Sequence, residues 1–322
     1  MNKANTALVL GATGGIGGEV ARQFLAAGWQ VKALSRKPAQ VQGAEGIEWA
    51  TGDAMVAADV LAAARGCAVI VHAVNPPGYR NWAGLVLPML DNTIAAAEAT
   101  GALVVLPGTV YNYGPEAFPC AGDDTPQRPL TRKGGLRVRM EAALEAFSGR
   151  GGRALVVRAG DFFGPMAGNT WFAQLVKPGQ PVKHIANPGQ PGVGHSWCYL
   201  PDLAATMVAL VERRADLPPF ARYNMTGHWD ADGSAMTCAI QRVAARHGLH
   251  AGIKAFPWWL AALAAPFNET MREVLEMRYL WQQPLRLDNA GVTAMLGQEA
   301  HTPLDVAVER TLRGLGCLHV KE

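Results

Sequence analysis

The chain has 322 residues, and 49% of them are hydrophobic, which is enough to bury a sizeable core in one large or two modest domains. Its net charge is +3 with basic and acidic residues interspersed, so the composition argues against nucleic acid as a partner. The five cysteines are dispersed and lack any paired metal-ligand spacing. They are typical of reduced thiols, so we expect a cytoplasmic protein without a bound metal ion.

The first predicted element is a short apolar strand, begun by about Thr6, which leaves no room for a signal peptide. A glycine-rich turn joins it to a helix expected from about Gly15 to Ala27. Gly11 permits a tight turn, and Gly14 lets the backbone approach a diphosphate. The free N–H groups of the helix would face that anion. The pattern predicts a pyrophosphate site, with a purely structural turn as the alternative. Its expected members are Gly11, Thr13, Gly14, Gly15, Ile16 and Gly17.

Apolar runs that are typical of buried strands alternate with helical windows over the next 130 or so residues. We expect strands at residues 30–34, 47–50, 68–73, 103–106 and 154–158, and helices at 89–99 and 135–147. Continuous apolar strands that alternate with helices indicate a parallel sheet covered on both faces. Right-handed crossovers then predict an α/β fold, a doubly wound parallel sheet of the Rossmann type.

Beyond residue 160 the pattern loosens, because prolines break the chain into short elements with aromatic residues between them. We expect residues 1–160 to form the dinucleotide-binding domain, with 201–225 returning to it. Residues 161–322 would form mainly a smaller C-terminal substrate lobe. The apolar stretch from Phe256 to Phe267 is far shorter than the roughly 20 residues of a membrane helix. It is expected to be a buried lid or a subunit contact, the latter in a homodimer.

Six segments carry a resemblance to a known family: Gly11–Gly17, Gly52–Asp53, His72–Val74, Thr109–Gly114, Arg158–Pro165 and Tyr199–Ala204. Together they resemble the extended short-chain dehydrogenase/reductase family, which includes NAD-dependent sugar-nucleotide epimerases and dehydratases. The resemblance covers nearly the whole chain. It implies that Asp53 accepts a hydrogen bond from the adenine amino group and that Ala73 and Val74 form the wall beside the cofactor. An aspartate that only caps a turn or helix is the alternative.

The residue about 25 positions past Gly11 decides between the two nicotinamide cofactors. An acid there would bind the ribose hydroxyls and repel a phosphate. This chain instead has Ser35, Arg36 and Lys37 after its second strand. A guanidinium is a forked, permanently charged partner for a 2′-phosphate, so the sequence favours NADP(H) over NAD(H). An ordinary exposed arginine is the alternative.

The helix after the fifth strand departs from the family, whose members carry Tyr-x-x-x-Lys there. Counted from the turn at Tyr113 and Gly114, Lys133 falls at the tyrosine position and Arg137 at the lysine position. The four-residue spacing places both side chains on one helical face. Lys133 would transfer a proton only if its pKa were lowered, and Arg137 would bind ribose hydroxyls. A solvated basic helix face is the alternative.

Other candidate residues surround this pair. Thr109 lies where the family has a hydroxyl that contacts the substrate, and Tyr111 or Tyr113 would supply the missing phenol. We therefore expect four catalytic residues, namely Thr109, Tyr113, Lys133 and Arg137, of which Lys133 also contacts the cofactor. The expected substrate residues are Asn75, Tyr111, Phe163, Trp171, His195 and Trp197.

The sequence supports two functions. The first is an NADPH-dependent oxidoreductase that acts on a small carbonyl, enone or sugar-like compound. The second is a non-catalytic NADP(H)-binding redox sensor or regulatory protein. Fold does not separate them, because function lies in the site. A pocket lined by Thr109, Tyr111 and Lys133 would favour the enzyme, whereas a pocket filled by side chains would favour the sensor.

Overall fold

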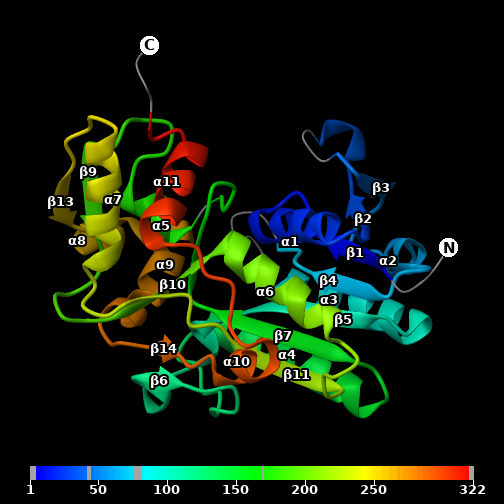
Figure 1. Ribbon diagram of the computed structural model, residues 1–322. Helices are drawn as coiled ribbons and strands as arrows, with labels where there is room; N and C mark the ends of the chain where they lie inside the picture. The colour runs from blue at the N-terminus through cyan, green and yellow to red at the C-terminus, as the bar shows by residue number, and fades with distance from the viewer. Residues whose placement is uncertain (1–4, 42–44, 76–81, 169, 268, 319–322) are drawn as a thin grey trace.

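The computed structural model describes residues 5–41, 45–75, 82–168, 170–267 and 269–318 (Figure 1). Its centre is a seven-stranded sheet with the order β11-β7-β5-β4-β1-β2-β3, in which every neighbouring pair is parallel. The predicted doubly wound Rossmann fold is therefore confirmed. The strands are β1 (Thr6–Leu10), β2 (Gln30–Ser35), β3 (Ile47–Thr51), β4 (Val69–His72), β5 (Leu103–Thr109), β7 (Ala154–Ala159) and β11 (Phe220–Asn224).

Helices cover both faces of the sheet because its inner strands are apolar on both sides. Alternate residues face opposite cores, so Val9 and Val71 pack in one buried cluster while Leu8 and Ile70 pack in the other. One face is covered by α1 (Gly15–Ala26) and α6 (Leu200–Glu212). The other is covered by α2 (Ala57–Ala64), α3 (Trp82–Thr100) and α4 (Arg132–Gly149).

The second lobe lies beside this sheet and is formed mostly by the green to red part of the chain (Figure 1). Its small sheets are β12 (His228–Asp230) with β10 (His195–Tyr199) and β8 (Asp161–Phe163), β9 (His184–Asn187) with β13 (Gly252–Ala255), and β6 (Cys120–Ala121) with β14 (Arg286–Leu287). Its helices are α5 (Trp171–Leu175), α7 (Ala235–Arg246), α8 (Trp258–Ala264), α9 (Glu269–Glu276) and α11 (Leu304–Gly314), whereas α10 (Ala290–Leu296) packs against β11 and α6 of the first lobe. After β10 the chain returns from the second lobe to the first, where β11 pairs with β7 at the edge of the central sheet.

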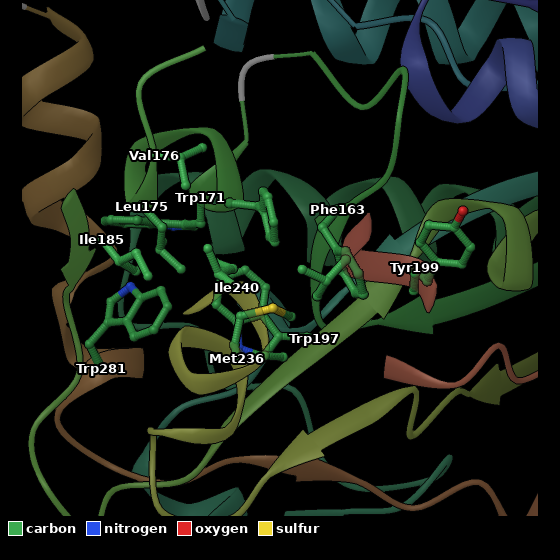
Figure 2. Close-up of a cluster of buried hydrophobic side chains, with 14 of the residues drawn as sticks. Phe163, Trp171, Leu175, Val176, Ile185, Trp197, Tyr199, Met236, Ile240 and Trp281 are labelled. Carbon is green, nitrogen blue, oxygen red and sulfur yellow. The ribbon is translucent and has the colours of Figure 1, made fainter. Parts of the chain in front are cut away.

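Aromatic side chains build the core of the second lobe (Figure 2). Phe163 stacks on Phe172 with ring centroids 5.6 Å apart, and both rings meet the edge of Trp197. Trp171 and Trp281 join the same buried cluster. Such rings bury a large apolar area each, so this lobe has a rigid core of its own beside the sheet.

Several elements differ from the sequence expectation: α3 begins at Trp82 and not near residue 89, and β5 continues to Thr109 and does not end at residue 106. Helix α4 begins at Arg132, three positions before the expected start, because the hydroxyl of Thr131 accepts a 3.0 Å hydrogen bond from the Gly134 N–H and caps the first turn. The stretch around α8 is not a buried lid, since Trp259, Leu263 and Phe267 are 65%, 66% and 93% exposed. The subunit-contact alternative stays a prediction. In the described part of the chain no helix has the length and apolar character needed to cross a bilayer.

Candidate active site

A cavity of about 1150 Å³ opens at the carboxyl ends of the central strands, where β1 separates β2 from β4. This is the topological switch point at which doubly wound sheets bind ligands. The volume exceeds the roughly 300–1,000 Å³ of a site for one drug-sized ligand. Fifteen of the residues predicted from the sequence line it: Gly11, Thr13, Gly14, Gly15, Ile16, Arg36, Asp53, Ala73, Val74, Asn75, Thr109, Tyr111, Lys133, Arg137 and Trp171.

The glycine turn has the geometry that the sequence predicts. Gly11 has a φ of +89°, and a Cβ there would lie 2.5 Å from the Ala73 carbonyl oxygen. A Cβ at Gly17 would lie 2.2 Å from the Gly11 carbonyl oxygen, so Gly17 lets α1 pack on the turn without itself lining the cavity. Helix α1 starts after Gly14 with no side-chain cap, and its first residues, Gly15 and Ile16, line the cavity. This cradle fits a dinucleotide diphosphate.

Replacing Gly14 by valine is expected to abolish cofactor binding without unfolding the chain. A Cβ at Gly14 would lie 3.3 Å from the Gly11 carbonyl oxygen, a contact that a small shift relieves, while the valine methyl groups would occupy the path of the diphosphate. The Tm with and without NADPH measures this. Gly149→Val, at an open position of α4, is the control. A cofactor-dependent rise of Tm in the Gly14 variant would contradict the assignment of the turn.

The outer end of the cavity is lined by Arg36, Lys37 and Asp53. The Arg36 side chain is exposed, so it is accessible to a ligand phosphate. Asp53 also stabilises its own turn, because its Oδ1 accepts a 3.0 Å hydrogen bond from the Met55 N–H. The turn-capping role is therefore present in the structure. The resemblance also implies that the Asp53 carboxylate contacts the adenine amino group, and this contact stays a prediction.

The inner end of the cavity is formed by α4. Lys133 and Arg137 both line it, so the helical register predicted from the sequence brings them to one site. Burial lowers the pKa of Lys133 to about 8, and the Arg137 guanidinium lowers it in the same direction. The carboxylates of Glu276 and Asp161 partly oppose this shift. Lys133 is thus an ammonium group at neutral pH whose acidity suits proton transfer.

A carboxylate that sequence reasoning missed lies at the centre of the inner end. Asp161 follows β7 and lines the cavity while being only 4% exposed. It accepts a 2.8 Å hydrogen bond from the Tyr111 hydroxyl at Oδ1, and its Oδ2 lies 2.9 Å from Nε2 of His195. The segment Arg158–Pro165 carried part of the family resemblance, so an acid directly after a strand inside that segment was the available signal.

Gly134 brings Tyr111 close to α4. A Cβ at Gly134 would lie 2.1 Å from the Tyr111 carbonyl oxygen, so only glycine lets the first turn of the helix pack against the Val110–Asn112 turn. Thr109 also shapes this turn, since its hydroxyl oxygen accepts a 2.8 Å hydrogen bond from the Tyr111 N–H. Tyr111 and Lys133 both line the cavity.

Tyr113 is the clearest correction, because it does not reach the cavity. Its ring is fully buried, and its hydroxyl oxygen accepts a 2.9 Å hydrogen bond from Nη1 of Arg158. Arg158 is fully buried too and forms an ion pair with Glu141 at 2.7 Å. Burial raises the pKa of the Tyr113 phenol. The expected catalytic role of Tyr113 is wrong, since this buried ion pair holds its hydroxyl in the core.

Three expected substrate residues also lie outside the lining. Phe163 and Trp197 belong to the aromatic core of the second lobe, because their rings pack on one another and on Phe172 (Figure 2). His195 is buried behind Asp161 and stacks on Trp281 with ring centroids 3.5 Å apart. A direct contact of these three side chains with a ligand in the cavity is therefore not supported.

Several lining residues come from positions that no sequence motif marked. Val274 on α9 and Met277 after it reach the cavity only through tertiary packing, and Gln174 follows Trp171 on α5. Val274 and Met277 add apolar side chains to the lining, and Gln174 adds a polar amide. Among the described residues, no group of three or more His, Cys, Asp or Glu side chains is placed to hold a metal ion.

Comparison with known proteins agrees with this geometry. Residues 11–132 match the family model described as NAD(P)H-binding. The chain thus has a Rossmann fold, and its first 130 or so residues contain a segment similar to NAD(P)H-binding domains. The Rossmann fold that the resemblance to the extended short-chain dehydrogenase/reductase family implies is confirmed over the whole chain. A search of curated protein sequences found no match.

Solved structures with this fold include several epimerases. UDP-glucose-4-epimerase from Stenotrophomonas maltophila, with bound NAD and formylated UDP-arabinopyranose, is 13% identical over 97% of each chain, with a TM-score of 0.77. UDP-glucose 4-epimerase from Brucella ovis, in complex with NAD, is 17% identical over 97% of this chain and 98% of that chain, with a TM-score of 0.74. UDP-N-acetylglucosamine 4-epimerase from Bacillus cereus is 15% identical over 95% and 94%, with a TM-score of 0.69. At these identities the likeness establishes the fold.

Proposed function

We propose that this chain is an NADP(H)-dependent oxidoreductase that acts on a small carbonyl compound or the corresponding alcohol. One observation carries the proposal: the cavity does not end at the dinucleotide cradle but continues to Thr109, Tyr111 and Lys133. A protein that binds the cofactor only as a structural or sensing group does not require this extra volume. One solved epimerase with the same fold, from Stenotrophomonas maltophila, contains bound NAD together with formylated UDP-arabinopyranose.

The chemistry divides between the cofactor and the side chains. When bound, NADPH supplies a hydride to the carbonyl carbon. Lys133, on the cavity wall with a pKa of about 8, donates a proton to the carbonyl oxygen. Arg137 donates hydrogen bonds to ribose hydroxyls and keeps its own proton. Val274 and Met277 would present apolar surface to the substrate beside these groups.

The redox sensor is the second candidate. The retained four-residue spacing of Lys133 and Arg137 is compatible with it, because cofactor binding alone would use the same cradle. A screen of small aldehydes, ketones and enones for NADPH oxidation separates the two functions. Turnover of any compound supports the enzyme, and NADPH binding without turnover of any compound supports the sensor.

The preference for NADPH over NADH is expected to depend on Arg36. The guanidinium is exposed at the outer end of the cavity, with no acid at position 35 or 36 to repel a phosphate. A charged hydrogen-bonded pair contributes about 1.5 to 3 kcal/mol, so Arg36→Ala should weaken NADPH binding by about 10- to 150-fold and leave NADH binding nearly unchanged. Calorimetric titration of both cofactors measures this. Equal affinities in the wild type, or an unchanged NADPH affinity in the variant, would contradict the assignment.

A further inference from the structure

Helix α8 presents an apolar face to solvent at the outer side of the second lobe, away from the central sheet (Figure 1). Its inner face is held by Trp258, whose ring packs against Trp171 and whose Nε1 donates a 3.0 Å hydrogen bond to the Pro188 carbonyl oxygen. Residues 255–267 contain no charged side chain. The large exposed side chains of this stretch, with their exposed fractions, are Trp259 (65%), Leu260 (47%), Leu263 (66%) and Phe267 (93%). A surface helix normally turns polar residues toward water, so an apolar outer face indicates an interaction site.

The area of this face matches the core of a protein–protein interface. An aromatic side chain has roughly 150–250 Å² of surface, so Trp259 and Phe267 alone expose roughly 250–400 Å². Leu260 and Leu263 extend the patch. A standard interface buries about 800 Å² per partner, and its core is depleted of charge and enriched in aromatic residues. The patch therefore has the composition of such a core and, with the strand beside it, the size.

An open strand edge precedes the apolar face. Among the described strands, β13 pairs with β9 alone, and its four residues are exposed. The backbone N–H groups of Gly252 and Phe256 donate hydrogen bonds of 3.1 and 2.8 Å toward β9. Successive residues of a strand direct their backbone groups to opposite sides, so the N–H and C=O groups of Ile253 and Ala255 face away from β9. Such an edge is a template for a further strand.

The strand edge and the apolar helix face together select the occupant. A lipid surface would leave the edge N–H groups without partners, and residues 255–267 lack the lysines and arginines of membrane-binding helices. A second copy of this chain satisfies both features, because a two-fold axis brings a second edge against the first and a second apolar face to the same interface. We propose that β13 and α8 form the interface of a homodimer, in which the two β13 strands pair antiparallel.

The sequence of β13 determines the register of this pairing. A two-fold axis at Lys254 places the two ammonium groups opposite each other, which is unfavourable. An axis at Ala255 places Ile253 opposite Pro257 of the second copy, which has no N–H to donate. An axis at Ile253 avoids both, so Ile253 pairs with Ile253 of the second copy and Ala255 pairs with Ala251.

The same register brings α8 to a hollow on the second copy. Pro257, immediately before α8, then lies opposite Leu249 of that copy. Leu249 lines a shallow surface hollow of about 380 Å³ together with Ala245 of α7 and Gly252. The arrangement is reciprocal, because each copy contributes one apolar helix face and one hollow.

Sedimentation velocity of the full chain tests the interface. At about 20 µM, above the micromolar Kd of the weaker standard-size interfaces, we expect a species of twice the chain mass. Leu263→Glu places a charge in the core of the interface and should raise the dimer Kd at least about 30-fold, the effect of losing a central residue. Val56→Glu, at a 46% exposed position of the first lobe, is the matched control and should leave the Kd unchanged. Circular dichroism verifies that both variants are folded.

Cysteine cross-linking tests the register. Opposed residues that exchange hydrogen bonds have Cα atoms about 5.5 Å apart, within the span of a disulfide. Ile253→Cys should therefore give a disulfide-linked dimer under mild oxidation. Ala255→Cys is the control, because the two copies of residue 255 would be offset by four positions, roughly 14 Å along the strands, too far for a disulfide. The native Cys120 thiol is exposed, so the wild type is oxidised in parallel.

The outcomes separate a second copy from other occupants. A wild-type chain that stays monomeric would overturn the proposal, and binding of that monomer to vesicles of phosphatidylcholine and phosphatidylglycerol would assign the face to lipid. A dimer that Leu263→Glu leaves intact would place the interface elsewhere and overturn it too. A dimer that cross-links at residue 255, or at neither position, would overturn the strand pairing. None of these measurements needs a substrate, so they are independent of the proposed oxidoreductase function.

Discussion

Lys133→Met is expected to lower turnover by about 10²- to 10⁴-fold, the usual range for the loss of a general acid, with NADPH affinity nearly intact. The pKa of Lys133 is about 8, because burial disfavours its charged form. Carbonyl reduction requires the ammonium form, so the wild-type rate should fall as the pH rises through about 8. The variant should lack this step in its pH profile. Steady-state rates between pH 6 and 10, roughly the span around this pKa, measure both effects.

The matched control for this experiment is Arg132→Met. Arg132 is the adjacent residue on α4, but its side chain is exposed and does not line the cavity. Its rate and pH profile should match the wild type. Arg137→Met should weaken NADPH binding as well as turnover, since Arg137 is proposed to hold the ribose. Full turnover by Lys133→Met would exclude Lys133 as the donor and leave Tyr111 or a bound water in that role.

Glu141→Leu is expected to destabilise the folded chain by about 3–5 kcal/mol. The carboxylate of Glu141 forms hydrogen bonds of 2.7–3.2 Å with the guanidinium of Arg158, which is fully buried. Its loss leaves the buried guanidinium without its ion-pair partner, and the hydrogen bonds that remain at Nη1 go to neutral oxygens of Tyr113, Asn224 and the Asp123 backbone. Urea unfolding at neutral pH measures the free energy of unfolding.

An exposed ion pair supplies the comparison for Glu141. Arg150 and Glu98 lie 2.7 Å apart, but their side chains are 58% and 46% exposed, so Glu98→Leu should cost less than about 1 kcal/mol. The double variant Glu141→Leu, Arg158→Met removes the stranded charge and should recover part of the stability. Similar costs for Glu141→Leu and Glu98→Leu would contradict the view that the buried pair fixes Tyr113 in the core.

Local sequence signals predicted the parts of the site that depend on backbone geometry. The φ of Gly11 and the close packing of Gly17 follow directly from the spacing of glycines after an apolar strand. The register of Lys133 and Arg137 also followed, because helical periodicity places residues four apart on one face. The start of α4 was placed too late, since the adjacent Gly134 and Gly135 obscured the Thr131 cap.

The parts that sequence reasoning missed depend on contacts between distant segments. Tyr113 has the same local surroundings in the sequence as Tyr111, and only the position of Arg158 shows which phenol is buried. The pairing of Asp161 with His195 joins residues 34 positions apart. No periodicity or spacing predicts that α9 supplies Val274 to the inner wall. Tertiary packing decides these positions.

The central claim is that this cavity brings a carbonyl compound against NADPH. The most direct measurement is transfer of deuterium from NADPH labelled at C4 of the nicotinamide to the small aldehydes and ketones of the screen, detected by mass spectrometry. The account predicts an alcohol product with one deuterium on the former carbonyl carbon, formed by the wild type and at about 1% or less of that rate by Lys133→Met. Tight NADPH binding with no label in any product would contradict it.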